Sequence, residues 1–215
     1  MLKLYSYWRS SSAYRVRIAL NLKALPHQIV PVHLVRDGGE QHLPAYRAMN
    51  PAGKVPLLVD GEFQLNQSLA IFDYLEQRNP TPALLPADLQ TRARVWAACQ
   101  QIACDIQPLQ NLSVLQHLSG PLGLPEAAKG DWCRHWIGQG LLALEAMLAP
   151  VAGECCFGDQ LSYADCCLVP QMYNAERFSV DMSSLPTLVR ITASLRQRPE
   201  FADAHPDKQP DSQSV

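Results

Sequence analysis

Residues 7–20 read YWRSSSAYRVRIAL, and this stretch decides the fold of the N-terminal part of the chain. Residues 2–7, LKLYSY, predict a strand, and residues 12–25, SAYRVRIALNLKAL, predict a helix. The three serines therefore stand where a strand ends and a helix begins. Residues 27–34, HQIVPVHL, predict a second strand, which the helical crossover makes a parallel neighbour of the first.

The next segments extend this α/β pattern with a hairpin and a helix. In residues 55–65, VPLLVDGEFQL, the dipeptide Asp60-Gly61 favours a tight turn between two short strands. Residues 66–78 predict a helix whose buried side carries Ile71, Phe72 and Leu75. The predicted order is β-α-β, an irregular segment rich in glycine and proline, and then β-β-α.

The chain changes character after residue 80. Residues 79–90, NPTPALLPADLQ, are rich in proline and predict a linker, so we place one domain at residues 1–80 and a second at 88–215. The second domain reads as all-helical, because apolar residues recur in it at helical spacing. Two such faces consist of Val95, Cys99, Ile102 and Ile106, and of Cys133, Ile137, Leu141, Leu144 and Leu148.

Three local features refine the prediction for the second domain. Pro108 is expected to kink or end the first of its helices. Ser162 and Asp165 have the spacing of a capping box at the start of another apolar helix. The tail at residues 205–215, HPDKQPDSQSV, is polar and contains proline, so we expect it to be poorly ordered.

Composition and charge exclude several classes of function. The chain has 215 residues, of which 47% are hydrophobic, and a formal net charge of −2, so it lacks the basic excess of a protein that binds nucleic acid or a membrane surface. It contains no bilayer-spanning run and no signal-peptide pattern, which predicts a cytoplasmic location. The seven cysteines are odd in number and form no C-x-x-C, which predicts reduced thiols, and the scattered histidines predict no metal site.

The serine run offers a position for an anion. Backbone N–H groups at a helix N-terminus are unpaired and lie at the positive end of the dipole, and Ser10, Ser11 and Ser12 add hydroxyl donors. A thiolate suits such a position, because a donated hydrogen bond lowers the pKa of a thiol. A phosphate suits it less well, because residues 8–15 contain no glycine.

The simpler interpretation is that the serines only cap the helix, since serine is a preferred N-cap residue. Two arginines on the same helix have an equally simple explanation. Arg15 and Arg17 would be solvated, or would lay their stems over packed neighbours, as most helix arginines do. Local chemistry leaves both interpretations open.

A series of motifs in this order resembles the zeta class of the glutathione transferases. They are YSYWRSSSAYRVRIAL, VRDGGEQH, NPAGKVPLLVDG, NQSLAIFDYLE, PTPALLPAD, DIQPLQNLSVL, GDQLSYADCCLVPQMYNAERF and QPD. The resemblance covers nearly the whole chain and implies a thioredoxin-like α/β domain followed by an all-helical domain, with glutathione bound and two copies forming a homodimer. It also implies a cis peptide bond at Val55-Pro56, whereas the base rate of about 5–6% for cis X-Pro bonds favours trans.

The same resemblance implies roles for individual residues. Ser10 is the first serine of the motif that hydrogen-bonds the glutathione sulfur, while Ser12 replaces the cysteine usual in that motif. The Val55 backbone would pair with the cysteinyl unit, Gln67 and Ser68 would hold the γ-glutamyl end, and Gln41 would lie near the glycyl end. The other positions expected to contact glutathione are Ser11, Ala13, Tyr14, Arg15, Pro56, Asp105, Gln107, Asn111, Leu112 and Ser113.

The resemblance further implies a reaction, the isomerisation of maleylacetoacetate to fumarylacetoacetate in tyrosine and phenylalanine breakdown. The thiolate would add to the conjugated cis double bond, allow rotation and leave again. Ser10 and Ser11 would act on the thiolate. Arg9 and Arg177 would hold the carboxylates of this cis-dicarboxylic keto acid, because a planar guanidinium binds a carboxylate through two hydrogen bonds.

Three alternatives stay open. Maleylpyruvate isomerases use the same chemistry, but they carry arginines where this chain has Leu112 and Ser113. A broad glutathione transferase or α-haloacid dehalogenase would use the same thiolate. A non-catalytic interaction module is the alternative from another class of function, because folds of this kind also serve as binding domains.

Overall fold

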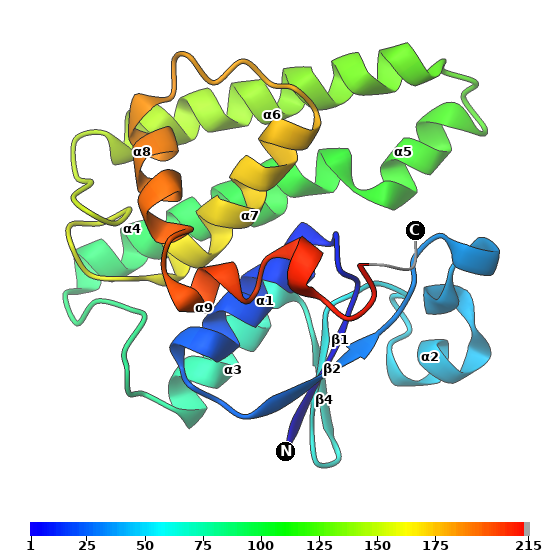
Figure 1. Cartoon of the computed structure of the whole chain (residues 1–215), viewed down its shortest axis with the longest axis horizontal. Coiled ribbons are helices and arrows are strands. Elements are labelled where there is room, and N and C mark those ends of the chain that lie inside the picture. Colours follow the sequence, from blue (N-terminus) through cyan, green and yellow to red (C-terminus); the bar gives the residue numbers. More distant parts are fainter. Residues whose placement is uncertain (213–215) are drawn as a thin grey trace. The chain divides into compact units, whose positions relative to one another are not determined.

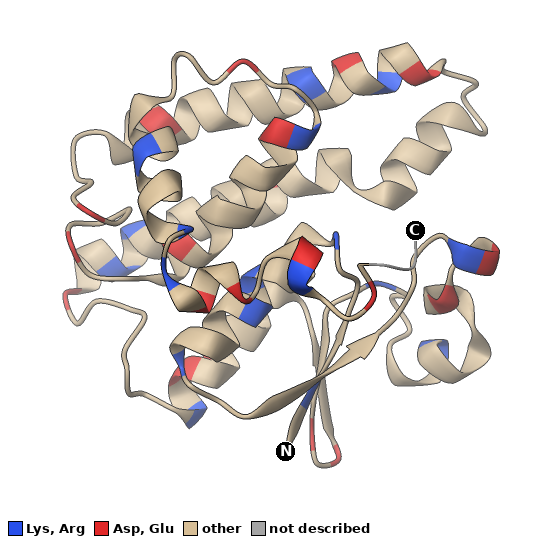
Figure 2. Cartoon of the chain, in the orientation of Figure 1, with Lys and Arg blue, Asp and Glu red and all other residues tan. Residues whose placement is uncertain are grey.

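The computed structural model describes residues 1–212 and divides the chain into two compact units. The first unit contains Met1–Ala83 together with the chain from Gln197 onward, and the second contains Leu84–Arg196. Figure 1 labels most of their helices and strands, and Figure 2 shows that acidic and basic residues are interspersed along both. The sequence-based boundaries place the chain from residue 197 onward in the helical domain, whereas the structure groups residues 197–212 with the first unit.

A four-stranded mixed sheet forms the centre of the first unit, with strand order β2-β1-β3-β4. Strand β1 (Leu2–Ser6) pairs in parallel with β2 (His27–Pro31), with Leu4 opposite Ile29. Strands β3 (Leu57–Asp60) and β4 (Phe63–Asn66) form the predicted hairpin, and β3 runs antiparallel to β1. The parallel pair and the hairpin are both confirmed, and this is the thioredoxin-like arrangement.

Helices α1 (Ser11–Leu22) and α3 (Ser68–Arg78) supply the apolar residues that pack with this sheet. Ile71, Phe72 and Leu75 are buried, as predicted from their spacing. The segment between β2 and β3 holds two short 3-10 turns, η1 (Arg36–Gly38) and η2 (Glu40–His42), and helix α2 (Pro44–Met49). This irregular segment and the end of β1 form one part of the candidate site.

A buried ion pair fixes the far end of α1. The Lys23 ammonium contacts the Glu76 carboxylate on α3 at 2.5 Å and donates to the carbonyls of Asn79 and Pro82, both at 2.8 Å. Two carbonyls and a carboxylate together satisfy the ammonium, which would otherwise be costly to bury. The contact ties the start of the linker to both helices of the first unit.

The C-terminal residues return to the first unit as helix α9 (Pro199–Ala202) and the 3-10 turn η5 (Pro206–Lys208). Pro206 and Asp211 are buried, and the side chain of Gln209 donates to the carbonyls of Asp203 and His205 at 3.1 and 3.0 Å. The expectation of a poorly ordered tail is therefore wrong for residues 205–212. Its last residues, 213–215, lie outside the described part of the chain.

The second unit is helical. It contains α4 (Leu89–Gln100), α5 (Leu112–Ser119), α6 (Glu126–Leu148), α7 (Tyr163–Arg177) and α8 (Pro186–Leu195). Both predicted apolar faces are buried, which confirms them. The predicted helix around Pro108 breaks earlier than expected, because a π-helical segment, η3 (Gln101–Ile106), follows α4 directly and leads into the 3-10 turn η4 (Gln107–Gln110).

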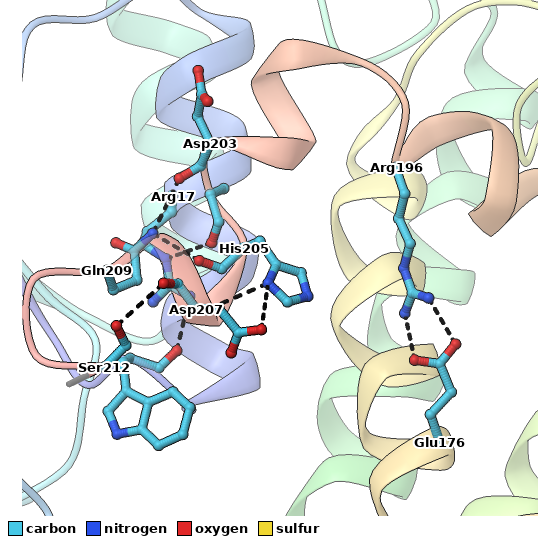
Figure 3. A network of polar contacts seen from close by, with 10 residues as sticks. Arg17, Glu176, Arg196, Asp203, His205, Asp207, Gln209 and Ser212 are labelled. Atoms are coloured by element: carbon cyan, nitrogen blue, oxygen red, sulfur yellow. Dashed lines mark hydrogen bonds and ion pairs between the residues drawn. The ribbon is translucent and has the colours of Figure 1, made fainter. Parts of the chain in front are cut away.

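The capping box at the start of α7 is confirmed. The Asp165 carboxylate accepts hydrogen bonds from the Ser162 N–H at 2.8 Å, the Ser162 hydroxyl at 2.9 Å and the Cys156 N–H at 2.8 Å. Near the other end of α7, Glu176 accepts two hydrogen bonds from the Arg196 guanidinium, at 2.7 and 2.9 Å (Figure 3). Both ends of α7 are thus fixed by charged groups within its own unit.

Within residues 1–212, none of the helices combines the length and the apolar character that crossing a bilayer requires. All seven cysteines lie in the described range, and none forms a disulfide there.

Candidate functional site

The turn between β1 and α1 brings the predicted serines to a helix N-terminus. Residues 7–10 form a turn closed by the Ser10 N–H, which donates to the Tyr7 carbonyl at 2.9 Å. Ser10 is the N-cap of α1, and its Oγ accepts from the Ala13 N–H at 3.2 Å. The capping interpretation is therefore correct, but it does not exclude a second use. A hydroxyl that accepts one hydrogen bond still has its own hydrogen to donate.

Three other predicted residues lie at this turn. Ser11 is buried at the first position of α1, and Ser12 follows it half-buried. Arg9 is half-buried, and its guanidinium lies 5.2 Å from the centroid of the Trp8 ring. The turn thus places a cation, several hydroxyls and the positive end of a helix dipole together, an arrangement that favours an anion.

Arg15 forms a second anion-binding position with the start of α3. Its side chain is only 1% exposed, and Nη1 donates to the Ser68 hydroxyl at 3.0 Å. Nε and Nη2 are buried without a hydrogen-bond partner among the described residues. The expectation that Arg15 is solvated or covers neighbours with its stem alone is wrong, because its charged head is buried as well.

The residues beside Arg15 suit a carboxylate. Ser68 is buried at the first position of α3, and Gln67 before it has a φ of 69°, which lies in the left-handed region. A buried guanidinium with two unpaired donor nitrogens is energetically unfavourable unless an anion binds there. The unused donors and the helix N-terminus together fit a carboxylate ligand.

The loop before β3, which also belongs to the first unit, contains a cis peptide bond. The Val55-Pro56 peptide bond is cis, as the family resemblance implied and against the base-rate expectation. The Lys54 carbonyl accepts from the Tyr46 hydroxyl at 2.7 Å and from the Asn50 side chain at 2.6 Å, which positions the residue directly before Val55. Burial is the main reason that the pKa of Tyr46 is raised to about 12, so its hydroxyl stays protonated and donates.

Gln41 and His33 lie in the segment that follows β2. The Gln41 side chain donates to the Leu34 carbonyl at 3.1 Å, while its Oε1 is buried and has no partner among the described residues. His33 was not predicted. Its Nδ1 accepts from the Arg36 N–H at 2.8 Å, which assigns the ring proton to Nε2, and that Nε2 is buried and unpartnered in the same part of the chain.

Two contacts fix the position of His33. Its backbone N–H donates to the Glu40 carboxylate at 2.7 Å, and its ring makes an edge contact with Tyr7 at 5.1 Å between centroids. Burial raises the pKa of Glu40, but the hydrogen bonds from His33 and Arg36 outweigh it and lower the pKa overall. No sequence pattern singles out His33. The one available signal is its place just beyond a strand that neighbours β1.

The remaining predicted residues belong to the helical unit. Asp105 is exposed in the π-helical segment, and Gln107 is half-buried at the start of η4. Asn111 caps α5, because its Oδ1 accepts from the Ser113 N–H at 3.1 Å and the Ser113 hydroxyl at 2.9 Å. The half-buried Leu112 lies between these two residues at the first position of α5.

Arg177 is exposed at the last position of α7, with its guanidinium 4.8 Å from the centroid of the Phe178 ring. Its charge also acts on Cys133, whose thiol pKa is raised by burial and lowered in part by Arg177. The structure thus forms three local groups from the predicted residues. These are the turn of Arg9 and the serines, the pair Arg15 and Ser68, and the α5 cap of Asn111 and Ser113. Asp105 and Arg177 lie on separate elements of the helical unit.

Comparisons with known proteins find similarity along nearly the whole chain. Residues 4–83 match the family model of the glutathione S-transferase N-terminal domain. The chain is 52% identical to the probable maleylacetoacetate isomerase of Vibrio cholerae, across 97% of each protein.

Two solved structures are similar over almost their full length. The holo structure of a maleyl pyruvate isomerase, a bacterial zeta-class glutathione S-transferase, has a TM-score of 0.94 and 44% identity, with 97% of this chain and 99% of that chain covered. A maleylacetoacetate isomerase from Anaeromyxobacter dehalogenans with glutathione bound in its active site has a TM-score of 0.88 and 44% identity, with 99% and 98% covered.

Proposed function

This chain belongs to the zeta-class glutathione transferase family, and we propose that it is a glutathione-dependent isomerase that converts maleylacetoacetate to fumarylacetoacetate. The observation that carries the proposal is the turn between β1 and α1. There the Ser10 hydroxyl, with its hydrogen still available, caps helix α1, and Arg9 precedes it in the same turn with its guanidinium 5.2 Å from the centroid of the Trp8 ring. The relatives named above supply the substrate class, and the turn supplies the chemistry that this substrate needs.

The first unit contains matching groups for each part of glutathione. Ser10, with Ser11 and Ser12 beside it, would hold the thiolate. We assign further contacts to Ala13 and Tyr14 in the same turn of α1, whose own N–H groups donate to the Ser10 hydroxyl and the Ser10 carbonyl. Val55, held by the cis bond before Pro56, would offer its backbone to the cysteinyl unit. The unused N–H groups of Arg15, with Gln67 and Ser68, suit the γ-glutamyl carboxylate.

The glycyl end has its own candidate partners. Gln41 and His33 each have a buried polar atom without a partner among the described residues, and both lie in the segment after β2. A neutral His33 would donate its Nε2–H to a carboxylate. In the helical unit we assign supporting contacts with glutathione to Asp105, Gln107, Asn111, Leu112 and Ser113.

The chemistry that bound glutathione supplies is reversible addition of its thiolate to the conjugated double bond, which permits rotation to the trans isomer without consuming glutathione. Ser10 would donate its hydroxyl hydrogen to the sulfur and so lower the pKa of the thiol. Arg9 and Arg177 would bind the substrate carboxylates and stabilise the negative charge that develops on the carbonyl oxygen. The protein thus contributes orientation and charge stabilisation.

Maleylpyruvate isomerisation is the second candidate, because one of the similar solved structures is a maleyl pyruvate isomerase. The residues at the start of α5 favour the longer substrate. Leu112 and Ser113 supply no cation there, whereas maleylpyruvate isomerases are expected to carry arginines at these positions. We also propose that the protein acts as a homodimer in the cytoplasm.

A single experiment distinguishes these functions. The protein would be assayed with glutathione on maleylacetoacetate, maleylpyruvate and dichloroacetate at equal concentrations, beside a calorimetric titration with glutathione alone. We expect glutathione binding and the highest kcat/KM on maleylacetoacetate. A higher value on maleylpyruvate or dichloroacetate would contradict the substrate assignment. Absence of glutathione binding would contradict the enzyme assignment and favour a non-catalytic interaction module.

A further inference from the structure

The C-terminal segment, which we define as Asp203–Ser212, makes an ordered network with the beginning of the chain. Figure 3 shows Gln209 donating to Asp203 and His205, and the Ser212 hydroxyl donating to the Asp207 carbonyl at 3.2 Å. These internal contacts give the segment a defined shape although it contains only one short 3-10 turn.

Arg17 joins this segment to the turn that carries Arg9 and Ser10. Its guanidinium is buried, and Nε donates to the Ala204 carbonyl at 3.0 Å. Nη2 donates to the Trp8 carbonyl at 3.0 Å, and Nη1 donates to the Ser6 hydroxyl at 3.0 Å and to the Tyr7 carbonyl at 3.4 Å. One side chain therefore connects the C-terminal segment to three consecutive residues at the end of β1.

Asp211 makes the second connection between the C-terminal segment and the turn. Its carboxylate accepts from the Trp8 N–H at 3.0 Å, although the two residues are 203 positions apart, and its side chain is buried. A carboxylate that accepts a backbone N–H makes a charge-assisted hydrogen bond, which is stronger than a bond between neutral groups. Asp211 thus fixes the N–H group of Trp8, and Arg17 fixes the carbonyl group of the same residue.

The backbone N–H and carbonyl groups of the turn find their hydrogen-bond partners through these contacts. Within residues 7–10, the Tyr7 carbonyl accepts from Ser10 and Arg17, the Trp8 N–H donates to Asp211, and the Trp8 carbonyl accepts from Arg17. The next two residues are Arg9 and Ser10. Catalytic groups must be held close to their productive geometry, since displacements of about 1 Å can cost about a hundredfold in rate.

We propose that Asp211 is a positioning residue for the isomerase reaction, and that through the Trp8 N–H it fixes the turn carrying Arg9 and Ser10. This inference rests on the proposed function for its kinetic consequence, but its structural part does not. The C-terminal segment therefore acts on the site from outside it. Asp211 itself contacts the turn backbone and has no assigned contact with substrate or glutathione.

The test compares three variants of the full chain. Asp211→Ala removes the acceptor, and Asp211→Asn keeps a side-chain oxygen that can accept from the Trp8 N–H. Asp207→Ala is the matched control, because it removes one carboxylate from the same segment, and the Asp207 side chain is 73% exposed and pairs with His205. Hydrogen exchange of the amides in residues 7–10, steady-state kinetics and thermal unfolding are measured for each.

We expect Asp211→Ala to accelerate exchange at the turn and to lower kcat by about tenfold or more, with KM for glutathione changed by less than about threefold. The pKa of bound glutathione, read from the ultraviolet absorbance of its thiolate, should rise because Ser10 is less well placed. Asp211→Asn should restore most of kcat, and Asp207→Ala should behave as the unmodified protein.

Two results would overturn the inference. One is an unchanged exchange rate and kcat in Asp211→Ala. The other is an equal loss of kcat and thermal midpoint in Asp211→Ala and Asp211→Asn, which would indicate a purely structural role. Failure of the proposed function looks different, because the unmodified protein would then show no turnover while the exchange difference at the turn persisted.

Discussion

At the scale of single residues, Ser10 shows that a capping role and a chemical role need not compete. The Ser10 oxygen accepts from the Ala13 N–H, which satisfies one of the free amides at the start of α1. This bond does not use the hydroxyl hydrogen, which can be donated to a sulfur. The sequence motif alone left these two roles as alternatives, because a pattern of three serines does not show which lone pair or hydrogen each one uses.

Substitution Ser10→Ala removes both the cap and the hydroxyl that we assign to the thiolate. We expect the free energy of unfolding to fall by about 0.5–2 kcal/mol through loss of the cap. The pKa of bound glutathione should rise, because the thiolate loses a hydrogen-bond donor. Turnover should therefore fall most near neutral pH and recover in part at a pH above the new pKa.

Ultraviolet titration of the thiolate in the glutathione complex measures this change. Ser12→Cys, which restores the residue usual in the family, serves as the control, and we expect it to leave the titration curve in place. An unchanged curve for Ser10→Ala would transfer the role to Ser11 or to the backbone N–H groups.

Arg15 and Arg17 are equally buried, yet the two arginines should respond to mutation in opposite ways. Arg17 donates to four acceptors, whereas Arg15 donates to one and keeps two nitrogens, Nε and Nη2, without a partner among the described residues. Arg15→Met should leave the free energy of unfolding of the ligand-free protein unchanged or increase it, because an unpaired buried charge is lost. Its affinity for glutathione should fall by about 1.5–3 kcal/mol.

Arg17→Met is the matched control for this prediction. It leaves backbone carbonyls at the end of β1 without their donor, so it should destabilise the ligand-free protein by about 3 kcal/mol or more. Chemical denaturation without glutathione and calorimetric titration with it measure the two quantities. A loss of stability in Arg15→Met equal to that in Arg17→Met would show that Arg15 has a structural role and not a binding role.

At the scale of elements, apolar periodicity predicted most of the helices and strands, and it failed where the spacing changed. The face of Val95, Cys99, Ile102 and Ile106 is buried as predicted, but the backbone passes from α4 into a π-helical segment at Gln101. The wider π-helical turn keeps Ile102 and Ile106 on the buried side. The apolar pattern therefore continues through the change from α-helix to π-helix and does not reveal it. Pro108 then lies within the 3-10 turn that follows.

Two buried glutamines hold this irregular region against α7. The Gln110 side chain donates to the Gln171 Oε1 at 2.8 Å, and the other amide atom of each is buried without a partner in the described part of the chain. The bond connects η4, which leads into the α5 cap at Asn111, to the helix that ends at Arg177.

Because each amide is the partner of the other, the two substitutions should be strongly non-additive. Gln110→Leu and Gln171→Leu alone should each cost about 1–3 kcal/mol, since each leaves a buried polar group unpaired. The double substitution should cost clearly less than the sum, because no unpaired amide remains. Urea unfolding of the two single variants and the double variant gives the coupling energy, and strict additivity would contradict the assigned hydrogen bond.

At the scale of the whole molecule, the first unit is assembled from both ends of the chain. The sequence predicted its sheet and helices because those depend on local periodicity. It did not predict that residues 205–212 are well ordered, because their structure depends on contacts between distant residues. Arg17 and Ala204 are 187 positions apart, and Trp8 and Asp211 are 203 positions apart. A short polar segment with prolines has no periodic signal, and its partners are far away in the sequence.

This discontinuity predicts that residues 1–83 are not a self-sufficient folding unit, although they include the whole region matched by the family model. Alone, they lack the Ala204 carbonyl for Arg17, the Asp211 carboxylate for Trp8 and the Glu200 carbonyl that accepts from Asn21 at 2.9 Å. Arg17 is buried, and a buried donor left without its acceptor costs about 1–3 kcal/mol, while Trp8 and Asn21 are half-buried and lose one hydrogen bond each.

We therefore expect the isolated segment 1–83 to be largely unfolded, and a peptide of residues 197–215 to restore its structure in proportion to peptide concentration. Circular dichroism and hydrogen exchange of the α1 amides measure the recovery. A peptide carrying Asp211→Ala is the control, and it should restore less structure at the same concentration because the Trp8 N–H stays unpaired. Cooperative unfolding of residues 1–83 alone, unaffected by either peptide, would show instead that the ends of the chain meet without supporting the fold.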